Sequence, residues 1–213
     1  MKRFILSMVL VVPALLASPA WAQDEGLYDP VAPAGSAFVR FINAGTKEEA
    51  LKPALNGKTY KEIGHDAVSA YFPLKAGKLD AALGAAKASA KAESGAYYTA
   101  VLNGETLTVL EDSPIGNATK AMIVFYNLSA TPAALKTADG KVEVVPPVEA
   151  GKNGAREINA IPVSLAVYEG NKKLADIGAV TLKRNEATAI VASANADGTL
   201  GVATAQATTD TTQ

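Results

Sequence analysis

The chain has 213 residues, of which 49% are hydrophobic, 19% charged and 6% aromatic, with one histidine and no cysteine. These counts exclude cysteine nucleophiles, disulfides, iron–sulfur clusters and metal centres built from several histidines or cysteines. Residues 23–117 carry 9 basic and 12 acidic side chains, and residues 118–213 carry 9 of each. Neither half therefore has the positive excess that binding to a nucleic acid requires. The length and apolar content predict one or two folded domains.

The first 22 residues have the pattern of a cleavable signal peptide. A basic start is followed by an apolar run at residues 4–17, and in Ala20-Trp21-Ala22 the two alanines supply small residues at the spacing that a signal peptidase needs. We expect cleavage between Ala22 and Gln23. A membrane anchor is disfavoured, because a bilayer span takes about 20 apolar residues. The pattern predicts an exported protein located in the periplasm.

Alternation of apolar and polar residues dominates the rest of the chain and predicts an all-β protein. Strands are expected, in chain order, at residues 37–43, 68–72, 97–102, 122–127, 163–168, 180–183 and 188–192. Turn-forming pairs such as Asn56-Gly57 and Asn103-Gly104 lie between these runs. Residues 79–92 alternate as an exposed strand would, but they are rich in the good helix formers Ala and Lys. We favour a strand there, with a helix as the alternative.

The two halves of the chain resemble each other. Residues 38–43 match residues 122–127 at a constant offset of 84, which aligns Phe41 with Phe125 and Asn43 with Asn127. Two unrelated strand-rich segments are the competing explanation; we favour an internal repeat. The repeat predicts two tandem antiparallel β-sandwich domains, at residues 26–112 and 118–204, followed by a flexible polar tail at 205–213.

No residue pattern predicts a catalytic, cofactor or metal site. His65 precedes Asp66, but neighbours on a strand point to opposite faces, so we expect a surface or turn residue rather than the base of a triad. Glu111 and Asp112 fall at the presumed linker, where adjacent acids are usually solvated. The chain contains no calcium-loop, phosphate-loop or serine-elbow motif. We therefore expect a protein that is not an enzyme and carries no cofactor.

Three arginines follow the signal peptide, at positions 40, 156 and 184. Arginine is the preferred planar clamp for a carboxylate. Arg40, Arg156 and the adjacent Glu157 are therefore candidate contacts for a partner protein or an acidic glycan. The competing and more common role is an ion pair between neighbouring strands.

A block near the expected mature start reads Tyr-Asp-Pro-Val-Ala-Pro-Ala-Gly-Ser at residues 28–36, and Phe-Val-Arg follows at residues 38–40. Further segments stand in the same order at residues 97–99, 127–129, 136–141, 156–159 and 163–165. This series resembles the AlgF family, the small periplasmic accessory proteins of alginate O-acetylation. The resemblance covers nearly the whole mature chain, with residues 46–96 matching poorly.

The resemblance implies a part in acetylating the 2- and 3-hydroxyls of mannuronate while alginate is exported. It implies as partners a membrane-bound O-acyltransferase and periplasmic proteins of the SGNH type, which carry the Ser-His-Asp chemistry. The protein itself is then a non-catalytic adaptor between them. Two alternatives are a module that binds the uronate polymer, alginate, and an intermediary that carries the acetyl group.

Overall fold

In a computed structural model, which describes residues 32–47, 49–195 and 197–210, every regular element is a β-strand. The strands are β1 (Ser36–Gly45), β2 (Pro53–Leu55), β3 (Lys58–Thr59), β4 (Ala67–Val68), β5 (Phe72–Lys75), β6 (Gly77–Leu83), β7 (Ala86–Ala92), β8 (Tyr97–Gly104), β9 (Thr106–Asp112), β10 (Ala121–Leu128), β11 (Ala133–Thr137), β12 (Glu143–Val148), β13 (Lys152–Ile158), β14 (Val163–Glu169), β15 (Lys172–Val180), β16 (Ala187–Ala194) and β17 (Leu200–Gln206). The predicted all-β class is confirmed. The predicted signal peptide at residues 1–22, with its predicted cleavage between Ala22 and Gln23, lies outside the described residues. Within those residues, the structure has no helix that could span a membrane.

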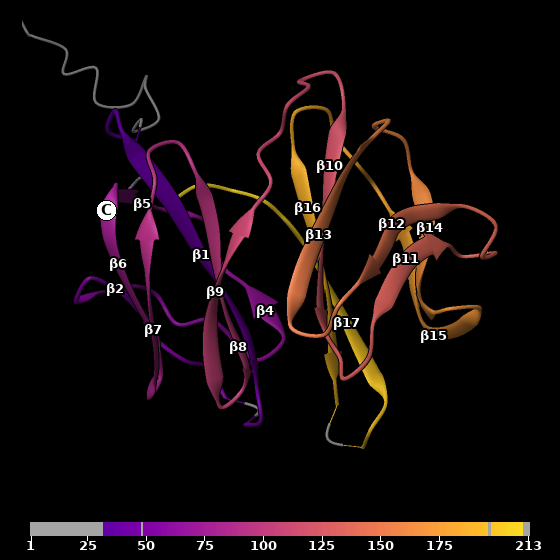
Figure 1. The fold of residues 1–213 in the computed structure, drawn as a ribbon, viewed down its shortest axis with the longest axis horizontal. Helices are drawn as coiled ribbons and strands as arrows, with labels where there is room; N and C mark the ends of the chain where they lie inside the picture. The colour runs from indigo at the N-terminus through magenta and orange to yellow at the C-terminus, as the bar shows by residue number, and fades with distance from the viewer. Residues whose placement is uncertain (1–31, 48, 196, 211–213) are drawn as a thin grey trace, which may run out of the picture.

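The strands form four sheets that stack as four layers (Figure 1). Strands β1 to β9 build the first half, with an outer sheet β3-β2-β6-β7 and an inner sheet β4-β1-β8-β9, in which β5 also pairs with β1. Strands β10 to β17 build the second half, with an inner sheet β13-β10-β16-β17 and an outer sheet β12-β11-β14-β15. Each half is thus a sandwich of two sheets. The domain limits at 26–112 and 118–204 stay a prediction.

The two inner sheets are buried on both faces. On β1, Val39 and Phe41 pack into the core of the first half, whereas Ile42 points the other way into an apolar layer between the halves. On β10, Phe125 packs into the core of the second half, and Val124 faces the layer between the halves. Burial on both faces explains why β1 and β10 read as nearly continuous apolar runs.

One strand pair in each half is parallel, which the expectation of antiparallel sandwiches did not include. β1 runs parallel to β8, and β10 runs parallel to β16, whereas the other strand pairs are antiparallel. A parallel pair needs a long crossover rather than a tight turn. In each half the chain between the two parallel strands builds the outer sheet, so the crossover itself supplies the second layer.

The aligned asparagines have the same role in both halves, which supports the internal repeat. Asn43 and Asn127 are fully buried, and each side-chain amide donates to backbone carbonyls further along the chain. For Asn127 these acceptors are Thr131 O and Val148 O, both at 2.8 Å. Each side-chain oxygen also accepts the backbone N–H two residues later, as from Ser129 at 3.1 Å. Each asparagine thereby ties the end of an inner strand to the loops around it.

Two expected strands differ from the structure. The run at 68–72 is split between β4 and β5, because the side-chain oxygen of Ser69 accepts the Phe41 N–H at 2.9 Å in place of a backbone partner. The run at 180–183 is a strand only at Val180, since Leu182 is buried in the core from a loop. Residues 79–92 form most of the β6–β7 hairpin, so the preference for strand over helix is confirmed.

The residues expected as a flexible tail at 205–213 pair with neighbouring segments in the part that the structure describes. Ala205 and Gln206 belong to β17, and Thr209 forms a parallel bridge with Tyr71 in the first half. Backbone pairing needs no apolar side chain, so a polar composition does not reveal it. Residues 211–213 lie outside the described residues.

We predict that Asn127→Ala lowers the free energy of unfolding by about 2–4 kcal/mol, because it leaves buried carbonyls and an N–H without partners. Asn43→Ala is expected to cost a similar amount, because the two side chains do the same work. Ser129→Ala, which removes a partly exposed hydroxyl bonded to Asn127, is the control and is expected to cost less than about 1 kcal/mol. Urea unfolding of the purified protein measures all three. Equal losses for Asn127→Ala and Ser129→Ala would contradict the assigned role.

Candidate functional site

The two inner sheets pack directly against each other. The apolar layer between them takes Ile42, Ala44, Val101 and Leu110 from the first half and Met122, Val124, Tyr126, Leu128, Ala189 and Val191 from the second. The halves are therefore joined by a shared core as well as by the connecting chain.

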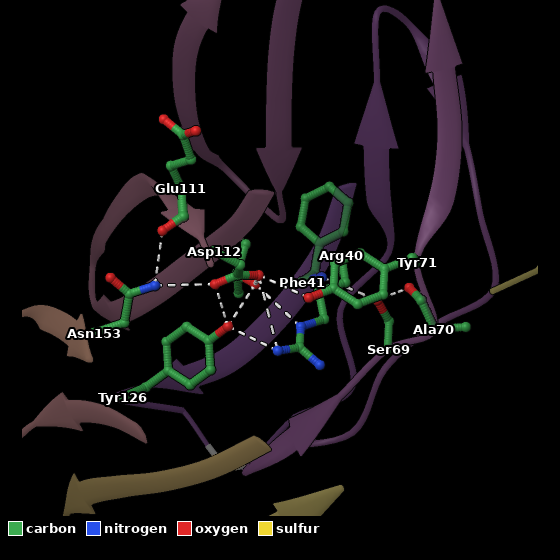
Figure 2. Close-up of polar contacts among 10 residues, drawn as sticks. Arg40, Phe41, Ser69, Ala70, Tyr71, Glu111, Asp112, Tyr126 and Asn153 are labelled. Carbon is green, nitrogen blue, oxygen red and sulfur yellow. Dashed lines mark hydrogen bonds and ion pairs between the residues drawn. The ribbon is translucent and has the colours of Figure 1, made fainter. Parts of the chain in front are cut away.

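A buried carboxylate lies within this junction (Figure 2). Asp112, at the end of β9, is 3% exposed. It accepts hydrogen bonds from the Tyr71 hydroxyl (2.7 Å) and the Thr99 hydroxyl (2.5 Å) of the first half. It also accepts one from the Tyr126 hydroxyl and one from the Asn153 amide (2.9 Å) of the second half. Donors from both halves thus converge on one carboxylate.

Arg40 is the fully buried positive charge beside Asp112. Its Nε donates to Thr99 Oγ1 (3.0 Å), its Nη2 donates to Tyr126 Oη (2.7 Å), and its Nη2 lies 3.8 Å from Asp112 Oδ2. The ring of Tyr71 covers the guanidinium, with 4.5 Å from Cζ to the ring centroid. Burial by itself would lower the pKa of Arg40, but the oxygens of Tyr126, Tyr71 and Asp112 outweigh it and raise the pKa. The Arg40 guanidinium therefore stays positively charged in its buried position beside Asp112.

Strand register brings these side chains together. Arg40 on β1 lies directly opposite Thr99 on β8, and Tyr126 on β10 lies directly opposite Asn153 on β13. Arg40 is in phase with Ile42, so its side chain must point into the junction. We call Arg40, Tyr71, Thr99, Asp112, Tyr126 and Asn153 the junction cluster.

The chemistry of the junction cluster is that of a positioning device rather than of a reactive centre. The Asp112 carboxylate is buried, and its oxygens accept four hydrogen bonds from side chains of the protein itself. Hydrogen bonds are directional, whereas apolar contacts only require proximity. The cluster therefore fixes how one half is oriented on the other.

Two predictions from the sequence are corrected here. Arg40 was a candidate contact for a partner or a glycan, with an ion pair between strands as the more common alternative; its complete burial excludes the surface role, and it lies 3.8 Å from Asp112 instead. Asp112 was expected as a solvated linker acid, but it is the centre of the cluster. The signal that was missed is Arg40 itself, a charge in phase with Ile42 on a strand whose other face is apolar.

Arg156 and Glu157 lie next to each other on β13 and have separate roles. Glu157 Oε1 accepts the backbone N–H groups of Gly116 (2.5 Å) and Asn117 (2.9 Å), and so anchors the chain that connects the halves. Arg156 is exposed, and its Nη1 donates to the carbonyl of Glu143 at 3.0 Å. Among the described residues, no carboxylate lies within ion-pair distance of Arg156.

His65 lies in a turn, but Asp66 does approach it, with 3.3 Å between Nδ1 and Oδ2. The predicted turn position of His65 is confirmed, whereas the strand geometry that would point Asp66 away from it is wrong, because Asp66 has a positive φ of 53° and lies in the same turn. Ser193 Oγ donates to the other Asp66 oxygen at 3.2 Å. The carboxylate therefore lies between the serine and the imidazole, whereas a catalytic triad needs the imidazole in the middle.

A cleft of about 340 Å³ opens beside the junction cluster. Tyr71 and Tyr97 line it from the first half, and Val124 and Ala187 line it from the second. The connecting chain at residues 113–115 and the C-terminal residues Ala207 and Thr209 complete its wall.

A family model described as "Alginate O-acetyl transferase AlgF" matches residues 8–189. Curated relatives named "Alginate biosynthesis protein AlgF" include one from Pseudomonas syringae pv. tomato, which is 40% identical over 174 residues, 81% of this chain and 78% of that protein. The chain belongs to the AlgF family. The AlgF relative from Pseudomonas aeruginosa is 38% identical over 168 residues, 78% of this chain and 77% of that protein. The resemblance inferred from the sequence is thereby confirmed.

A solved structure of the C-terminal domain of AlgF from P. aeruginosa is also similar to this chain. The sequences are 39% identical, and the match covers 41% of this chain and 98% of that one, with a TM-score of 0.38.

We predict strong coupling between Arg40 and Asp112 in this AlgF family member. Arg40→Met and Asp112→Asn should each cost about 3–5 kcal/mol of unfolding free energy, because each leaves a buried charge without its partner. The double variant should be more stable than the sum of the two losses predicts, by at least about 1 kcal/mol. The exposed pair Lys173 and Asp176, 2.8 Å apart, serves as the control and should show no measurable coupling. Denaturant unfolding of the single and double variants measures the coupling energy of each pair. Additive losses for Arg40 and Asp112 would show that the two buried side chains are not coupled.

A second prediction concerns alkaline pH. Burial raises the pKa of both Tyr71 and Tyr126 well above the usual tyrosine value. The unfolded chain therefore loses these protons near pH 10, while the folded protein keeps them. Their contribution to stability should be constant below about pH 10 and should fall above it, by about 1.4 kcal/mol per pH unit for each tyrosine. Denaturant unfolding between pH 9 and 11.5 measures how steeply the free energy of unfolding falls with pH. Tyr126→Phe should make this slope smaller by about 1.4 kcal/mol per pH unit, the share of one tyrosine proton. An unchanged slope in that variant would be inconsistent with this account.

Proposed function

We propose that this AlgF family protein is a non-catalytic periplasmic adaptor required for O-acetylation of alginate during its export. Family membership supports the pathway, since the matching family model is described as an alginate O-acetyl transferase and the relatives are named alginate biosynthesis proteins. The signal-peptide pattern supports the periplasmic location. Burial of the junction cluster supports a role without catalysis, because its acid and hydroxyl groups are engaged with one another.

The observation that carries the proposal is the joining of the two inner sheets. Because the inner sheets pack on each other, the two outer sheets lie at opposite ends of the stack (Figure 1). The junction cluster holds these ends in one orientation. A protein that holds two separate surfaces in a fixed orientation loses little conformational entropy when partners bind to them. That property suits a protein that keeps a membrane-bound O-acyltransferase and an SGNH-type periplasmic protein together.

We infer that one contact surface lies at the end of the second sandwich where β12 begins and β13 ends. Val142 and Ile161 are 57% and 58% exposed there, and they are the exposed large hydrophobic side chains among the described residues. Arg156 lies at the same end, held by its bond to the start of β12. Two aliphatic side chains, at the same end as an arginine that has no carboxylate within ion-pair distance among the described residues, suit a partner that offers a carboxylate flanked by apolar residues. We call Val142, Arg156 and Ile161 the end surface.

We predict that the end surface is needed for acetylation. In an alginate-producing Pseudomonas strain that lacks its own AlgF, the wild-type protein should restore the acetyl content of exported alginate. The variants Val142→Asp, Ile161→Asp and Arg156→Glu should weaken partner binding roughly 30-fold each, the loss typical of a central interface residue, and should lower the acetyl content accordingly.

Arg184→Glu is the matched control, because Arg184 is also exposed and also has no carboxylate within ion-pair distance among the described residues. Thermal unfolding of each purified variant separates loss of contact from loss of folding. Full acetylation with the folded end-surface variants would show that the partner does not bind the end surface. Full acetylation without any AlgF protein would refute the proposed function.

A polymer-binding role is the second candidate, and one feature favours it. Lys78 on β6 and Lys91 on β7 lie directly opposite each other on exposed positions of the outer sheet, with Lys87 further along β7. Like charges directly opposite each other are destabilising, and Asp80 at 2.6 Å from Lys78 offsets part of this repulsion. A polymer that carries carboxylates would offset more of it. Titration calorimetry with polymannuronate, repeated with Lys78→Glu plus Lys91→Glu, tests this candidate. A flat titration with the wild-type protein would remove it.

A further inference from the structure

The C-terminal residues cross from the second half to the first and bind there. After β17 ends, the Ala207 N–H donates to Ala187 O of the second half at 2.7 Å. The next residues pass to the first half, where Thr208 O accepts the Tyr71 N–H at 2.7 Å and the Asp210 N–H donates to Tyr71 O at 2.8 Å. Figure 1 shows this crossing as the yellow trace that leaves β17 for the side of the first half. We call residues 207–210 the C-terminal strap.

Tyr71, the residue that the strap holds, is also a member of the junction cluster. Its hydroxyl donates to Asp112 at 2.7 Å, its ring covers the Arg40 guanidinium, and its edge meets the ring of Tyr97 with 5.1 Å between centroids. Yet Tyr71 lies between β4 and β5, outside both strands. Apart from its isolated bridge to Thr209, its backbone has no place in the regular sheet.

The strap is a second crossing of the chain between the halves. The first is the segment that connects β9 to β10, which Glu157 anchors. Residues of both crossings line the cleft of about 340 Å³, so the cleft separates them. Two bodies joined by one segment can turn about it, whereas a second, separate attachment opposes that rotation.

We propose that the C-terminal strap is the latch of the junction: by pairing with the backbone of Tyr71 it holds that side chain over Arg40 and Asp112, and so keeps the two halves in one orientation. Release of the strap leaves the Tyr71 N–H and C=O unpaired at an exposed edge and removes one wall of the cleft. Both changes loosen the one side chain of the first half that packs over the buried cation. The strap thereby couples the C-terminal end of the chain to the junction cluster, independently of the adaptor role.

The orientation of the halves tests this latch directly. The chain has no cysteine, so Lys87→Cys on the first outer sheet and Ser164→Cys on the second give two unique sites for spin labels. Both positions are exposed. Pulsed electron–electron distance measurements should give one narrow distribution for the full chain. Deletion of residues 207–213 should broaden it, and deletion of residues 211–213 alone should not. A distribution that stays narrow after the longer deletion would overturn the proposal.

A single hydrogen bond provides the matched test at Tyr71. Asp210→Pro removes the N–H that Tyr71 O accepts, whereas Asp210→Ala keeps it and removes only the side chain. Amide hydrogen exchange at Tyr71 should be about five- to tenfold faster in the proline variant than in the alanine variant, the change that one lost hydrogen bond brings. The hydroxyl signal of Tyr71, followed by NMR, should lose protection in the same variant. Equal protection in the two variants would show that the strap does not hold Tyr71.

Discussion

The burial of one carboxylate constrains much of this molecule. A charged carboxylate away from water is tolerated only when hydrogen bonds and a counter-charge replace its hydration. Asp112 obtains these from Arg40 and from four hydrogen-bond donors, and two of the donors belong to the second half. The requirement can therefore be met only in one arrangement of the two halves. Apolar packing holds the two inner sheets in contact, and the junction cluster fixes their relative orientation.

The strand arrangement follows from the same junction. Because the inner sheets are covered on both sides, their central strands can be apolar on both faces. Parallel strand pairs occur mainly in sheets that are buried in this way. β1 beside β8 and β10 beside β16 are these strands. The outer sheets keep one face in contact with water, and side chains along β7 alternate between partly buried alanines and exposed lysines or serine. The strands at the centre of the stack are therefore nearly continuous apolar runs, whereas strands at its ends alternate apolar and polar residues.

Much of the fold could be predicted from local patterns. Runs of β-branched and aromatic residues marked the central strands, and the aligned pair Asn43 and Asn127 marked a repeat whose two copies make equivalent bonds. The junction cluster could not be predicted this way, because the burial of Asp112 depends on Tyr126 and Asn153, which are remote in sequence. Strands made of small or polar residues, such as β17, were also missed, since their pairing is set by backbone neighbours rather than by their own side chains. The same reasoning explains why the sequence left Arg40 open between a partner contact and an ion pair, and did not identify Asp112 as its counter-charge.

The long sequence separations across the junction bear on how the protein reaches its folded state. Arg40 meets Thr99 over 59 residues and Tyr126 over 86 residues, and contacts of such range form late because the intervening chain must first be ordered. Until β10 and β13 arrive, the first half presents an apolar face that includes Ile42 and Leu110, together with a charge pair short of two donors. A partly folded chain of this kind is prone to aggregate. The junction that orients the two halves therefore also covers the apolar face and completes the hydrogen bonds that the first half would leave exposed on its own.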